Sequence, residues 1–288
     1  MNAWWYRARY PLRAPRPECV RIARALGPLE RAGDEAPLGD ADLGDLAHTG
    51  RGATRFLGVY GADGALAAMR AHGLVERLGA LGFHRVGVEL DLADPFEHAL
   101  RVYDGEPARR LGEIVAARRP VDALGPVALP PGSDALEIGW LAIENPVTHV
   151  PAALPGQVRP GLGLLRAVID MALAAATVLR LAAVLARPAH YHLASAYHPW
   201  FRPLDPRDEG DFLALRRATR ALSRRDASWA IARGEVTLDG APWRWHPPRM
   251  CAPIDPALRA WMTSAAYATA AGEGAAGAFA LAPPAAPA

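Results

Sequence analysis

The stretch from Leu154 to Ala172 reads LPGQVRPGLGLLRAVIDMA, and its pattern decides which fold we expect. A proline-broken polar segment leads to two glycines separated by one residue, Gly161 and Gly163, and apolar residues at helical spacing follow at once. Because glycine has no side chain, backbone N–H groups at such a helix start can point outward, and the helix dipole adds positive charge. The pattern has two interpretations: a phosphate cradle, or a turn that permits tight packing.

The elements on either side of this stretch indicate the fold class. Apolar runs and alternation predict strands at 56–60, 84–92, 98–103, 111–117 and 136–143, and a helix at 65–79. After the glycine pair we expect a helix over 161–176, a buried strand over 178–185, and helices over 193–197 and 208–222. This order predicts an α/β (α+β) fold, with a mixed, largely antiparallel sheet flanked by helices.

Four segments are expected along the chain. Residues 1–50 form an N-terminal segment that packs on the main domain, and residues 51–222 form the α/β domain itself. Residues 223–264 read as a small C-terminal helix–hairpin unit with its turn at Asp239 and Gly240. Residues 265–288 are mostly Ala, Gly and Pro, and this composition predicts a disordered tail.

Composition excludes several functional classes. The 288 residues carry a net charge of +2, and all 32 basic residues are arginine, a bias typical of a GC-rich bacterial genome. A chain without lysine has no Schiff-base or Walker lysine. The charge balance predicts no nucleic-acid partner, and charged residues within the apolar region 161–188 argue against a membrane span. The two cysteines, Cys19 and Cys251, indicate reduced thiols in a cytoplasmic protein.

The order strand, Gln157-Val-Arg159-Pro-Gly161-Leu162-Gly163-Leu164, helix, apolar strand and Tyr-bearing helix resembles the GCN5-related N-acetyltransferase (GNAT) family over roughly residues 80–215. In that family an R/Q-x-x-G-x-G/A loop after the fourth strand binds the pyrophosphate of an acyl-CoA. The resemblance implies acetyl-CoA or another acyl-CoA as cofactor, bound by Gln157, Arg159, Gly161, Leu162, Gly163 and Leu164. Val158 lies where the family has Gln or Arg.

The resemblance also implies acyl transfer to an amine-type small-molecule acceptor. Glu144, or Glu137 on the same predicted strand, would be the general base toward the ammonium group. Tyr197 would protonate the departing thiolate. The stretch before Tyr197 carries His190 where the family has Asn, and Trp200 follows where it has Gly.

A histidine cluster leaves further alternatives open. His190 and His192 form an H-x-H pair whose rings share one face of an extended segment, and His198 follows closely. Near neutral pH, His190 or His192 could act as acid or base in a pocket beside the glycine loop. No specific metal motif is present, so we expect no metal. Two other functions remain: a non-catalytic GNAT-like module that senses a ligand or binds a partner, and a histidine-based metal enzyme.

Overall fold

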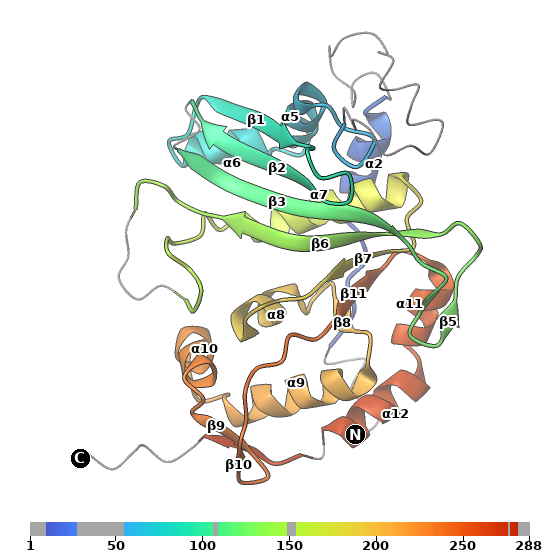
Figure 1. Cartoon of the computed structure of the whole chain (residues 1–288), viewed down its shortest axis with the longest axis vertical. Coiled ribbons are helices and arrows are strands. Elements are labelled where there is room, and N and C mark those ends of the chain that lie inside the picture. The colour runs from blue at the N-terminus through green and yellow to red at the C-terminus, as the bar shows by residue number, and fades with distance from the viewer. Residues whose placement is uncertain (1–9, 28–54, 106–108, 149–153, 276, 282–288) are drawn as a thin grey trace.

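A computed structural model describes residues 10–27, 55–105, 109–148, 154–275 and 277–281 (Figure 1). The helices are α2 (Pro17–Ala25), α5 (Ala62–Ala71), α6 (Leu74–Ala80), α7 (Leu165–Val178), α8 (Tyr191–Tyr197), α9 (Pro206–Ala218), α10 (Arg224–Ala232), α11 (Pro256–Met262) and α12 (Ala265–Gly274). The strands are β1 (Val86–Asp91), β2 (His98–Asp104), β3 (Arg110–Pro120), β4 (Ala123–Leu124), β5 (Val127–Ala128), β6 (Asp134–Ile143), β7 (Ala183–Ala186), β8 (Arg202–Pro203), β9 (Val236–Leu238), β10 (Ala241–Pro242), β11 (Met250–Pro253) and β12 (Phe279–Leu281).

One mixed sheet of seven strands organises the molecule, in the order β1-β2-β3-β6-β7-β11-β8 (Figure 1). The strands β1, β2, β3 and β6 pair antiparallel, and β7 runs parallel to β6 after the crossover through α7. The last two strands restore antiparallel pairing, since β11 pairs with both β7 and β8. The prediction of an α+β fold with a mixed, mostly antiparallel sheet is confirmed.

The helices gather in two groups. Helices α2, α5, α6 and α7 lie toward the β1–β6 side of the molecule, and α8 to α12 lie toward the β7–β8 side (Figure 1). Helix α7 buries Ile169, Leu173 and Ala176, which recur at helical spacing and join the main core. Strand β7 is buried along its whole length, as expected for a central strand covered on both faces.

Two predicted strands differ from the structure. The segment 56–60 forms only a single bridge between Phe56 and Tyr60, because the chain turns back at Leu57 (φ 56°) and Gly58 (φ 73°). The strand predicted over 178–185 begins at Ala183, and Val178 instead ends α7. An unbroken apolar run fits a buried helix end as well as a buried strand, so hydrophobicity alone did not locate this boundary.

The helix and hairpin predicted within residues 223–264 form as α10 and β9–β10, but the rest of the predicted C-terminal organisation is wrong. Strand β11 lies between β7 and β8 in the main sheet, so residues 223–264 are not a separate unit. Residues 265–274, assigned to a disordered tail, form α12, whose Tyr267 is buried and donates a hydrogen bond to the carbonyl of Pro203 at 2.7 Å. Gly274 brings α12 so close to α9 that a Cβ there would lie 2.8 Å from the backbone of Arg207. Because Gly274 has no side chain, the backbones of α12 and α9 can pack closely, and this packing orders the segment.

At the other terminus, α2 packs on α7 through Cys19, Ala23 and Ala174, and Arg16 Nε lies 2.8 Å from Asp170 Oδ2. The rest of the predicted N-terminal segment, 1–9 and 28–50, falls outside the described residues. No helix in the described ranges has both the length and the apolar character needed to cross a membrane.

Candidate functional site

A β-bulge divides β6 into a half that pairs with β7 and a half, here called unpaired, that does not. Parallel pairing with β7 runs from Ala135 to Ile138 and ends there. In the ladder with β3, Ala116 lies opposite Ile138 and Val115 lies opposite Trp140, which leaves Gly139 as the extra residue. Because a bulge bends a strand and increases its twist, β6 diverges from β7 at this point. The half from Trp140 onward pairs with β3 but has no ladder to β7.

The glycine loop returns to the end of this unpaired half. Asn145 donates its backbone N–H to the carbonyl of Pro160 at 2.8 Å, which closes the loop that follows β6. A Cβ added to Gly161 would lie 3.4 Å from the carbonyl oxygen of Ile143. The fold therefore places the backbone on either side of Glu144 beside Pro160 and Gly161.

The loop alternates between exposed and buried residues. Gly161 and Gly163 are exposed, and Leu162 and Leu164 are buried. Within the described part of the chain, the N–H groups from Gly161 to Ala167 donate to no protein acceptor, and α7 has no side-chain cap. These donors lie at the positive end of a helix dipole, so the loop has the chemistry of an anion site.

Two polar side chains of the predicted site flank the loop. Gln157 and Arg159 are partly exposed, and no ion pair or side-chain hydrogen bond joins either of them to another described residue. Val158, between them, is 71% exposed. Gly163 has φ +73°, a conformation that favours glycine, and a Cβ there would meet nothing within 4 Å. The guanidinium of Arg159 is thus available to an anionic ligand.

His190 of the predicted histidine pair lies against the segment that leads into the glycine loop. Gly156 (φ +76°) packs so closely on Nε2 of His190 that no Cβ would fit between them. The rings of His190 and His192 stack at 5.5 Å with an interplanar angle of 10°. Burial lowers the pKa of both rings, and burial together with His190 and Arg224 lowers that of His192 to about 4. These shifts favour the neutral form of both rings, and they make His192 the weaker base of the two.

Tyr197 lies deeper than the other predicted site residues. Its ring packs 5.5 Å from that of Phe201, and burial raises the pKa of its hydroxyl to about 12. Tyr197 therefore stays protonated at neutral pH, as a proton donor must. No hydrogen bond in the described ranges links it to Glu144, whose carboxylate is partly exposed and forms no ion pair with another described residue.

His198 belongs to a different environment from the other two histidines. Its Nε2 donates to Glu209, and Arg216 approaches its Nδ1 at 3.5 Å, so it links α8 to α9. Nowhere in the described ranges do three or more His, Cys, Asp or Glu side chains come close enough to hold a metal ion. This geometry favours a structural role for His198.

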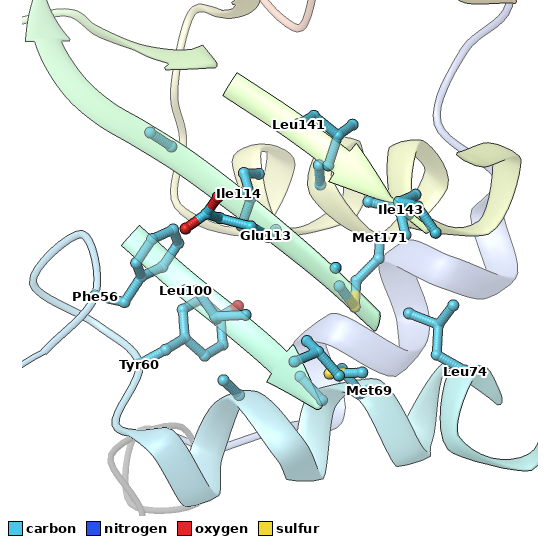
Figure 2. A pocket seen from close by; sticks show the side chains of 18 of the residues that line it. Phe56, Tyr60, Met69, Leu74, Leu100, Glu113, Ile114, Leu141, Ile143 and Met171 are labelled. Carbon is cyan, nitrogen blue, oxygen red and sulfur yellow. The ribbon is translucent and has the colours of Figure 1, made fainter. Parts of the chain in front are cut away.

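An apolar cavity of about 150 Å³ lies between the sheet and helices α5, α6 and α7 (Figure 2). Leu162 and Leu164 of the glycine loop line it, as do Leu141 and Ile143 of the unpaired half of β6. Glu113 is the charged residue on the described wall, and its carboxylate accepts hydrogen bonds from Arg101 at 2.8 Å and Arg110 at 3.1 Å.

No sequence prediction included this cavity, or Gly139 and Gly156. A glycine inside a strand pattern is a known sign of a bulge, so Gly139 had a readable signal. The approach of Gly156 to His190 joins distant segments and had none. Compared with models of known protein families, with curated proteins and with solved structures, the chain matches none of them.

Proposed function

We propose that this protein is an acyl-CoA-dependent acyltransferase with an amine-type small-molecule acceptor, and that its fold is GNAT-like. The main support is the run of backbone N–H groups from Gly161 to Ala167 without a protein acceptor. A pyrophosphate needs several such donors at once. In further support, β6 and β7 are the fourth and fifth long strands along the chain, the positions to which the resemblance assigns the cofactor loop and its following strand.

The unpaired half of β6 supplies a place for the extended arm of the cofactor. Parallel pairing ends after Ile138 and leaves backbone groups of β6 without a β7 ladder, and the glycine loop is hydrogen-bonded just beyond the end of the same half of β6. A phosphate group at Gly161 and Gly163 would direct the thioester along this edge. Arg159 adds a positive charge beside the phosphates.

In the proposed reaction the neutral amine attacks the thioester carbonyl carbon. A C–N bond forms and the C–S bond breaks, so the nitrogen loses one proton and the thiolate gains one. Glu144 accepts the proton of the amine, directly or through water, and the neutral ring of His190 is a second acceptor beside the loop. Tyr197, with its pKa near 12, gives a proton to the thiolate.

The test compares two glycines with nearly the same positive φ. Gly163 (φ +73°) and Gly132 (φ +75°) are exposed, and a Cβ at either would meet nothing within 4 Å. Aspartate tolerates this conformation and carries a negative charge. Gly163→Asp should weaken CoA binding at least tenfold by calorimetry, whereas Gly132→Asp should leave it unchanged. A parent protein that binds no CoA, or an equal loss in both variants, contradicts the proposal.

The burial of Tyr197 favours a second candidate, a module that binds the same ligand without transferring its acyl group. Thiol release from acetyl-CoA in the presence of a mixture of small amines separates the two functions. Release that falls at least tenfold in Tyr197→Phe supports transfer. CoA binding without any release in the parent supports the non-catalytic module.

A further inference from the structure

We propose that the acyl group is a fatty acyl chain of medium length, and that its tail occupies the apolar cavity beneath the sheet. This inference rests on the proposed function, because it assigns the substrate class of the same site. Figure 2 shows Phe56 and Tyr60 on one side of the cavity and Leu74 and Ile143 on the other, with Met69 and Met171 between them.

The cavity exists because small residues face the sheet. Helix α5 presents Ala65 and Ala68 to it, and α7 presents Ala172, Ala175 and Ala176. Larger side chains at these positions would fill the layer between helix and sheet. Protein interiors contain few voids larger than a water molecule, and a void of this size lowers stability through lost contacts. A ligand that enters it recovers those contacts.

The chemistry of the wall selects a hydrocarbon. Its described residues are almost wholly aliphatic or aromatic, and the carboxylate of Glu113 is already paired with Arg101 and Arg110. A polar ligand would lose its hydrogen bonds to water without replacement. An apolar cavity of the same size, lined by Leu, Ile and Phe, is known to hold benzene, which has six carbons. The space therefore suits roughly six carbons of an acyl chain.

The glycine loop connects this cavity to the anion site. Gly161 and Gly163 expose the free N–H groups, whereas Leu162 and Leu164, which alternate with them, turn into the cavity wall. Leu141 and Ile143 extend the wall along the half of β6 that β7 leaves unpaired. One short loop thus borders both a place for a phosphate head and one end of the apolar cavity. The pantetheine arm, which separates the phosphates from the acyl chain in an acyl-CoA, would lie along β6 between them.

The experiment measures the affinity of the full chain for CoA, acetyl-CoA, hexanoyl-CoA, octanoyl-CoA and palmitoyl-CoA by calorimetry. Each buried methylene should tighten binding about fourfold, so affinity should rise from acetyl to octanoyl and stop rising by palmitoyl. If CoA itself does not bind, the proposed function fails. If CoA binds and all acyl lengths bind equally, only the present inference fails.

Two variants narrow the cavity without touching the loop. Ala68→Leu and Ala172→Leu each add three carbons to the wall, so the tightest-binding chain should become shorter by two to four carbons while the affinity for CoA stays the same. Ala71→Leu, on the exposed end of α5, is the matched control and should change neither. An unchanged length preference in both cavity variants overturns the assignment, and the series in the parent protein decides if neither variant folds.

Discussion

Nε2 of His198 lies 2.9 Å from Oε1 of Glu209, and both side chains are almost completely buried. Arg202 Nε lies 3.5 Å from the same oxygen, and its guanidinium also donates to the carbonyls of His198 and Tyr10. The guanidinium of Arg216 approaches the other ring nitrogen of His198. This network joins α8, α9 and the N-terminal segment, so it fixes the helix that carries Tyr197.

Removal of Glu209 should destabilise the protein strongly. Glu209→Ala leaves Arg202 as a buried charge without its carboxylate, and breaking a buried pair in this way lowers the free energy of unfolding by about 3–5 kcal/mol. Urea denaturation measures the loss. Glu235→Ala is the control, since its pair with Arg233 is exposed and should contribute less than about 1 kcal/mol. Equal losses in the two variants would show that the buried network stabilises the protein no more than an exposed ion pair does.

Stability should fall as the pH drops from about 6.5 to about 4. Burial, with Arg202 and Arg216, lowers the pKa of His198 to about 4 in spite of Glu209. Between the two pKa values the unfolded chain binds the proton and the folded one does not, so the free energy of unfolding rises with pH and levels off above 6.5. The contribution is roughly 3 kcal/mol. In His198→Gln, urea midpoints measured at pH 4.5 and pH 7 should lie closer together than in the parent; an identical separation contradicts the assignment.

The bulge at Gly139 should be needed for CoA binding, whereas its glycine should not. Deletion of Gly139 removes the extra residue, so Ile138 and Trp140 follow each other opposite Ala116 and Val115, and the bend that turns β6 away from β7 is lost. CoA should then fail to raise the melting temperature. Gly139→Ala should behave as the parent, because its Cβ would meet Glu97 and Val115 only at 3.8 Å. If CoA still raises the melting temperature of the deletion variant, the bulge is not needed for CoA binding.

Arg159→Ala should weaken CoA binding about tenfold to a hundredfold, the range expected for a hydrogen bond to a charged group. The salt dependence of the dissociation constant should fall with it, because one fixed charge beside the phosphates is lost. Calorimetry at two ionic strengths measures both effects. Arg225→Ala, on the exposed face of α10, should change neither value. If both variants bind CoA as the parent does, Arg159 takes no part in the site.

Local patterns predicted the local parts of this fold. The strands β1, β2, β3 and β6 were predictable because their side chains alternate with period two. Helices α9, α10 and α11 were predictable because Asp205, Ser223 and Asp255 cap their first turns. Strand β11 was not, since Met250–Pro253 is buried throughout and shows no alternation. Helix α12 was missed because an Ala-rich composition does not reveal a packing partner distant in sequence.

The candidate site divides in the same way. Gly161, Gly163 and Glu144 were predictable from the order of strand, loop and helix. The contact of Gly156 with His190 and the cavity under β6 depend on tertiary packing, as does the environment that separates His198 from His192.

The insertion of β11 between β7 and β8 has a consequence for biosynthesis. While a ribosome makes this chain, β7 is complete long before residue 250, and one of its edges then has no partner. An apolar strand with an open edge is a template for pairing with other chains. Nascent chains stalled between residues 222 and 250 should therefore be the aggregation-prone species, and completion of Met250–Pro253 should end that exposure.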